Sequence, residues 1–199
     1  MSRSAIRAAK IAQIAAIADR VEQRPDVGRV RVFEATVMLP LAAMPQHDVV
    51  MLAQTATGEA AVTLIGDPEL VQTGPAATFL ATNAARFGVT DNDDPDAAIL
   101  LNHFTGTATA PTSVATWKQL SAWFAAKTGI DNSTLLQPQQ LAPFLLVNYA
   151  RLPAGVVGFL LNEILRPSFH RFVRGLLARN HMTSLPLFVR PISTGRAHE

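Results

Sequence analysis

The chain has 199 residues, of which 49% are hydrophobic and 16% are charged, and its formal net charge is +2. A chain of this length and apolar content can bury a sizeable core, which excludes global disorder. The absence of cysteine excludes disulfide bonds, thiolate metal sites and a cysteine nucleophile. Because few charged residues are left to cover the surface, we expect some apolar surface to be covered by a partner or by copies of the same chain.

The order of the expected elements predicts an α+β fold, with a small antiparallel β-meander from the N-terminal half packed with a mostly helical C-terminal half. Residues 1–25 are expected to form an N-terminal amphipathic helix or arm, 26–195 one globular domain and 196–199 a loose tail. The most apolar stretch, 141–165, is interrupted by prolines and charges and does not predict a membrane span. We expect a soluble chain, in the cytoplasm rather than secreted.

The N-terminal segment is basic. Arg3, Arg7 and Lys10 precede an apolar stripe at helical spacing, and residues 1–18 contain no acid. This composition resembles an organellar transit peptide, although an ordinary first helix over 4–23 is the favoured interpretation. Cations at a helix N-terminus oppose the macrodipole, so the first turns either fray or meet an anionic partner. Arg3, Arg7 and Lys10 are accordingly candidates for contacting a nucleic acid.

The elements that follow are predicted from periodicity and from turn residues. Strands are expected over 30–39, 49–55 and 59–65, with a tight turn at 56–58 joining the last two in a hairpin. The rest is expected to be mostly helical, with helices over 76–87, 94–104, 114–128 and 168–180 and short proline-broken helices between 138 and 167. Residues 185–192 contain two prolines and predict an edge strand or an arm.

No motif for catalysis, a metal or a phosphate loop stands out, and no cofactor is expected. The run Asp91, Asp93, Asp94 and Asp96 lacks the glycine and the distal glutamate of an EF-hand loop, so an exposed loop with Asp94 as helix cap is favoured. The histidines lack metal-ligand spacing, and His103 is interpreted as a satisfied core or capping residue rather than a catalytic base.

The C-terminal segment carries the strongest functional signal, because no acid occurs between Ile164 and Ala197. On the helix predicted over 168–180, Phe169, Phe172, Val173, Leu176 and Leu177 form an apolar face. Basic side chains lie on or near the rest of this helix: Arg166, His170, Arg171, Arg174 and Arg179. Arginine binds phosphate groups well, although these side chains could equally be solvated or paired with acids.

Three functions remain open on these grounds. The first is a non-enzymatic structural or assembly protein that binds the nucleic-acid backbone electrostatically and without sequence preference, as a homo-oligomer or within a larger complex. The second is a protein-interaction subunit whose basic face meets an acidic protein or a lipid surface. The third is an enzyme whose site is assembled from residues distant in the sequence.

Overall fold

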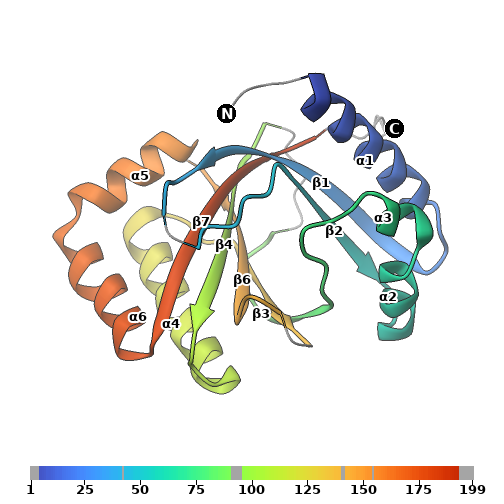
Figure 1. The fold of residues 1–199 in the computed structure, drawn as a ribbon. Helices are drawn as coiled ribbons and strands as arrows, with labels where there is room; N and C mark the ends of the chain where they lie inside the picture. The colour runs from blue at the N-terminus through green and yellow to red at the C-terminus, as the bar shows by residue number, and fades with distance from the viewer. Residues whose placement is uncertain (1–4, 42, 91–95, 140–141, 154, 193–199) are drawn as a thin grey trace.

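An antiparallel sheet of seven strands, in the order β2–β1–β7–β4–β6–β5–β3, forms the centre of the described structure. This computed structural model describes residues 5–41, 43–90, 96–139, 142–153 and 155–192, apart from the side chains of 162–164. The sheet is strongly curled, with helices packed at both of its ends (Figure 1). The predicted α+β class is confirmed.

The bounds of the elements are as follows. The strands are β1 (Val27–Met38), β2 (Val49–Thr55), β3 (Ala81–Phe87), β4 (Ala98–Gly106), β5 (Ser133–Pro138), β6 (Leu146–Leu152) and β7 (Met182–Pro191). The helices are α1 (Ala5–Glu22), α2 (Gly58–Ile65), α3 (Pro68–Gln72), α4 (Ala110–Thr128), α5 (Gly155–Leu165), the π-helix η1 (Phe169–Arg174) and α6 (Gly175–Arg179).

Strand β4 shows how the two faces of the sheet differ. Leu100 and Phe104 point toward the helices, where Leu100 joins Phe159 of α5 and Phe104 joins Trp117 of α4 in apolar clusters. The alternate residue Leu101 joins Tyr149 of β6 on the opposite face. Because β4 is buried on both faces, its sequence is a nearly continuous apolar run rather than an alternating one.

The expected strand over 59–65, and with it the expected hairpin, is wrong. This segment is helix α2, whose N-terminus is capped by Thr57: its hydroxyl accepts a hydrogen bond from the backbone N–H of Ala60 at 3.1 Å. Ala60 and Leu64, four residues apart, are the buried positions of this helix. The spacing of the two buried residues is therefore helical, and the turn residues before them form a cap instead of a hairpin.

The helices expected over 76–87 and 94–104 are also wrong, because these segments contain β3 and β4. The expected cap at Asp94 and the neighbouring acids Asp91 and Asp93 lie outside the described residues. Between 138 and 167, where short helices were expected, the chain forms β6 and then α5, after β5 has ended at Pro138. Pairing with strands far away in the sequence stabilises these segments, and local periodicity cannot report such pairing.

Strand β7 is central, which corrects the expected edge strand. Its two prolines are tolerated because each is paired with only one of the two neighbouring strands: Pro186 with β4 and Pro191 with β1. Pairing with β1 stops at Leu187, one residue after Pro186, whereas pairing with β4 stops at Val189, before Pro191. Each proline therefore has a hydrogen-bonded neighbour on one side only, and its missing N–H does not interrupt the sheet.

Helix α4 and the helical segment over 168–180 are confirmed, the latter as η1 followed by α6. Val173, Leu176 and Leu177 are buried as expected, and Phe169 and Phe172 pack against the same cluster while partly exposed. Helix α1 is also present, and its residues Ile17, Ala18 and Val21 pack with Val30 and Val32 of β1.

Replacing Leu176, which is 5% exposed, with alanine should lower the free energy of unfolding by about 2–5 kcal/mol, because it leaves a cavity in the core. Urea unfolding followed by circular dichroism measures this change. Val62→Ala on α2, where the side chain is 58% exposed, is the matched control and should change stability by less than about 0.5 kcal/mol. Equal effects of the two substitutions would contradict the packing of α6.

Candidate functional site

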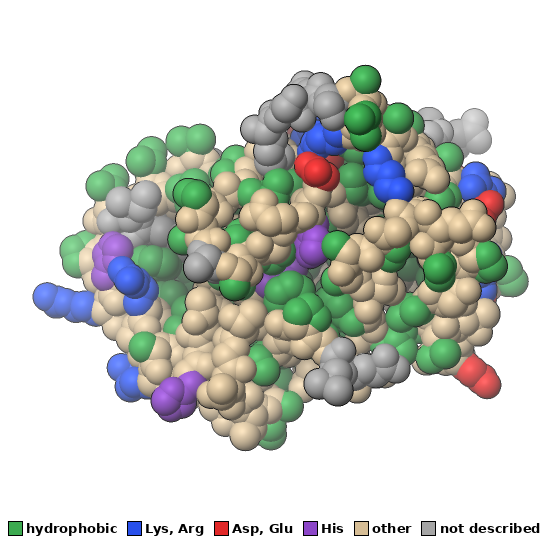
Figure 2. All heavy atoms as spheres, in the orientation of Figure 1, with side chains coloured by type: hydrophobic (Ala, Val, Ile, Leu, Met, Phe, Trp, Pro, Cys, Tyr) green, Lys and Arg blue, Asp and Glu red, His purple; other side chains and the backbone are tan. Residues whose placement is uncertain are grey.

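The exposed arginines of the C-terminal segment line one short stretch of helix. Arg171, Arg174 and Arg179 are exposed on η1 and α6, and no ion pair is seen for them within the described part of the chain. His170 is also exposed, whereas Arg166 is half-buried. Figure 2 shows Lys and Arg side chains projecting at this end of the molecule.

The N-terminal basic residues lie elsewhere and have partners within the chain. The guanidinium group of Arg7 lies 3.0 Å from a carboxylate oxygen of Glu34 and 3.0 Å from one of Asp48. Lys10 donates to the carbonyl oxygen of Thr73 at 2.5 Å, and Arg3 lies outside the described residues. Because α1 and α6 lie at opposite ends of the molecule (Figure 1), the predicted basic residues do not form one continuous surface.

A cavity of about 870 Å³ lies between the sheet and the helices α4, α5, η1 and α6. Its walls are mostly apolar and aromatic, with Trp117, Phe124, Phe159, Phe169 and Val173 among the lining residues. Arg174, His170 and His181 line it as well and are exposed, so they mark its opening to solvent. The cavity therefore joins an apolar interior to part of the basic segment predicted from the sequence.

Polar side chains of the sheet form the floor of this cavity. Asn102 of β4 and Asn148 of β6 are cross-strand partners, and both line the cavity. The indole N–H of Trp117 donates to Oδ1 of Asn148 at 2.9 Å, and the hydroxyl of Ser184 lies 2.8 Å from Oδ1 of Asn102. Because an indole N–H can only donate, it fixes the orientation of the Asn148 amide and turns its NH₂ group away from Trp117.

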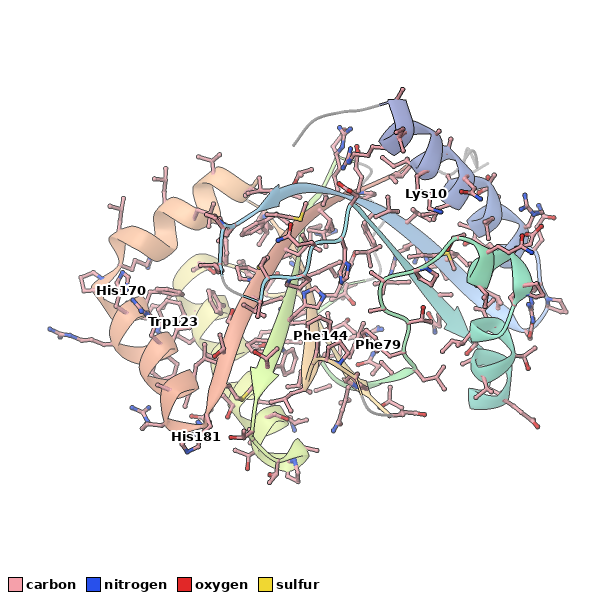
Figure 3. All side chains as sticks on the ribbon, in the orientation of Figure 1. Lys10, Phe79, Trp123, Phe144, His170 and His181 are labelled. Atoms are coloured by element: carbon pink, nitrogen blue, oxygen red, sulfur yellow. The ribbon has the colours of Figure 1, made fainter. Side chains whose placement is uncertain are left out.

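An aromatic cluster supports the wall formed by α4 and η1. The ring of Trp123 stacks on Phe172 with centroids 6.1 Å apart, and it also contacts Phe124 and Phe169. Figure 3 shows Trp123 and His170 near η1, and His181 at the turn between α6 and β7. The π-helical form of η1 is an uncommon geometry that occurs frequently at functional sites.

The floor of the cavity was missed by sequence reasoning. The segment containing Asn102 was assigned to a helix, so its position beside Asn148 and Ser184 was not recognised. The signal that could have revealed it is the pair of asparagines within two strongly apolar segments, 98–104 and 145–152, because a buried amide needs hydrogen-bond partners.

His103 lies on the opposite face of the sheet and is 5% exposed. Its ring is 4.5 Å from that of Phe144 and 6.4 Å from that of His47, measured between centroids. Figure 3 shows Phe144 and Phe79 from the same aromatic group. His103 is therefore a core residue, as expected, although its Nδ1 is buried without a hydrogen-bond partner.

Burial, and to a smaller extent the nearby His47, lowers the pKa of His103 to about 4, against the opposing effect of hydrogen bonds to the backbone of Leu185 and Leu101. Burial also lowers the pKa of His47. Both shifts favour the neutral ring, because the low dielectric around the pair disfavours a positive charge. The pair is therefore suited to a neutral core at ordinary pH rather than to holding a proton.

Within the described residues, no group of three or more acidic or histidine side chains gathers as a metal site. None of the described helices is both long enough and apolar enough to cross a membrane. Comparison with known proteins gives no assignment: no family model matches the chain, and neither a curated protein nor a solved structure matches it.

The lowered pKa of His103 predicts a pH dependence of stability. The unfolded histidine takes up a proton near pH 6.5, whereas the folded one does so only near pH 4. Between these values the unfolded chain binds the extra proton, so the free energy of unfolding should fall as the pH is lowered, by about 3 kcal/mol in all.

Urea unfolding measured from pH 7 to pH 4 tests this dependence in the native chain and in His103→Leu. The variant should show a smaller loss of stability across this range. His181→Asn, which removes an exposed histidine but keeps a residue that tolerates the positive φ of 52° at this position, should behave like the native chain. An unchanged slope in His103→Leu would contradict the assignment to His103.

Proposed function

We propose that this protein binds an amphipathic anion, a small molecule with an apolar body and an anionic head group. The observation that carries the proposal is the lining of the cavity, which combines aromatic walls, an amide floor and an opening bordered by Arg174. Such a mostly apolar cavity with a few directed polar groups is the usual form of a small-molecule site.

The apolar body of the ligand would occupy the space between α4, α5 and the sheet. The volume of about 870 Å³ falls within the range of roughly 300–1,000 Å³ typical of ligand sites. Trp117, Phe124 and Phe159 would contact this part of the ligand, and removing its apolar surface from water would supply most of the binding free energy.

The anionic head group would lie at the opening. The guanidinium group of Arg174 can form two parallel hydrogen bonds with a carboxylate or a phosphate, and His170 and His181 border the same opening. At the other end, the amide of Asn148 is held by Trp117, so its NH₂ group can donate to a polar atom of the ligand.

The intrinsic fluorescence of Trp117 and Trp123, the two tryptophans of the chain, provides the assay. Titration with dodecanoate or dodecyl phosphate should give a saturable change, and the neutral dodecanol should bind more weakly. Arg174→Gln should weaken binding of the anions by roughly 10-fold or more, because it removes a charge-assisted hydrogen bond worth about 1.5–3 kcal/mol.

Arg179→Gln is the matched control, since Arg179 is exposed on the next turns of the same helical segment and does not line the cavity. It should bind like the native chain. Ala178→Phe, which narrows the opening at an exposed lining residue, should weaken all three ligands. No saturable change with any ligand, or equal affinity for dodecanol and dodecanoate, would refute the proposal.

The nucleic-acid function predicted from the sequence remains a second candidate. The exposed positions of Arg171, Arg174 and Arg179 support it, because backbone binding requires accessible cations rather than a base-reading motif. A structural or assembly role belongs to the same hypothesis, and light scattering of the purified protein would detect self-association.

Fluorescence anisotropy with single-stranded and duplex oligonucleotides tests this candidate. Affinity should fall steeply with salt and be insensitive to sequence. Replacing one phosphate-contacting arginine, Arg171 or Arg174, should reduce the salt slope by roughly one unit. Absence of binding at low salt would eliminate the candidate, and full binding by the double variant Arg171→Ala, Arg174→Ala would move the contact elsewhere.

A further inference from the structure

We infer that helix α5 and the arginines of the following helical segment form a docking surface for an anionic lipid bilayer. The surface consists of Val157, Leu161 and Leu165, called here the α5 row, together with Arg171 and Arg174. Its apolar part is separate from the cavity, because no member of the α5 row lines the cavity, whereas Arg174 borders the cavity opening.

The α5 row is an exposed apolar stripe. Val157, Leu161 and Leu165 are 71%, 52% and 73% exposed, and their spacing of four residues places them along one side of the helix. Phe159 of the same helix is buried against Phe188 and Phe124. Helix α5 therefore packs into the core through one side and presents large apolar side chains to the outside through another.

Positive charge lies next to this row. Helix α5 packs against η1, which carries Arg171 and Arg174 with exposed side chains. From Leu165 to Ala197 the sequence contains no acid. In Figure 2, hydrophobic side chains project over α5 and basic side chains project beside them, at the same end of the molecule.

This combination favours a lipid surface over the other possible occupants. Apolar side chains that enter the acyl boundary, together with cations that meet the head groups, are the two attractions that hold a protein at an anionic membrane. A nucleic acid would pair with Arg171 and Arg174 but would leave the α5 row in water. A second copy packed through the α5 row about a two-fold axis would bring four arginines, two from each copy, to the border of one interface, where like charges repel.

Flotation with lipid vesicles tests the inference. The native chain should float with vesicles of phosphatidylcholine and phosphatidylglycerol and remain behind with phosphatidylcholine alone. Two variants should lose this binding: the triple variant Val157→Ser, Leu161→Ser, Leu165→Ser, and the double variant Arg171→Gln, Arg174→Gln. Each arginine should contribute roughly fivefold to the partition coefficient, so the double variant should bind at least an order of magnitude more weakly.

A matched control is the double variant Val62→Ser, Val71→Ser, which removes two exposed apolar side chains, 58% and 57% exposed, from α2 and α3. It should float like the native chain. Circular dichroism shows whether each variant folds. The triple α5 variant should still bind dodecanoate, so failure of bilayer docking and failure of the cavity proposal are distinguishable.

Four results would overturn the inference. The first is equal flotation with and without phosphatidylglycerol. The second is native-like flotation of the folded triple α5 variant. The third is a mass that doubles with concentration in light scattering and returns to the monomer value in the triple variant, which would assign the α5 row to a second copy. Binding to oligonucleotides without any flotation would likewise refute the lipid surface and favour nucleic acid.

Discussion

The pairing of β7 between β1 and β4 is the constraint on which the rest of the structure depends. Leu187, Phe188 and Val189 of this strand are 0% exposed, and their side chains enter the clusters on both faces of the sheet. The β1–β2 pair, from the N-terminal part of the chain, is joined to the other strands through β7 alone in the sheet order. The sheet is therefore complete only when the C-terminal strand has been inserted, which requires contacts between residues far apart in the sequence.

The position of the cavity follows from how far β7 pairs with each of its two neighbours, β1 and β4. Pairing between β1 and β7 begins at Met38 and Leu187, so from Met182 to Pro186 strand β7 pairs with β4 only. Ser184 and Pro186 lie in this part of the strand and line the cavity. The helical segment η1–α6 precedes β7 directly and packs against it, so the strand that completes the sheet also positions the basic opening above the amide floor.

The sequence predicted the fold class and the elements whose signals are local. Helix α4 has a threonine cap and ends at Gly129 in the left-handed conformation, and the apolar face around Leu176 has helical spacing. Strand β4 could not be assigned in this way, because burial on both faces removes the alternation that marks a strand. The wrong assignment of β4 hid the role of Asn102 and, with it, the polar floor of the cavity.

The candidate site was predictable only in part, for a related reason. The absence of acids after Ile164 identified the basic segment, but sequence cannot show which of its cations face a cavity and which face solvent alone. The structure makes this distinction within one helical segment, where Arg174 borders the cavity and Arg179 does not. It also separates Arg7, held by Glu34 and Asp48, from the exposed arginines that resemble it in the sequence.

The cavity and the α5 row are two observations that favour the same ligand chemistry. The first is a mostly apolar cavity, open to solvent, with a cation at its opening, and the second is an exposed apolar stripe with cations beside it. An amphiphile with an anionic head group fits both sites, because its apolar part matches the apolar side chains and its head group matches the arginines at each of them. Arg174 belongs to both surfaces, so a head group bound at the cavity opening would neutralise one of the charges that attract an anionic bilayer. A ligand-filled protein would consequently be held less strongly at the bilayer than an empty one, by the free energy that this one arginine contributes.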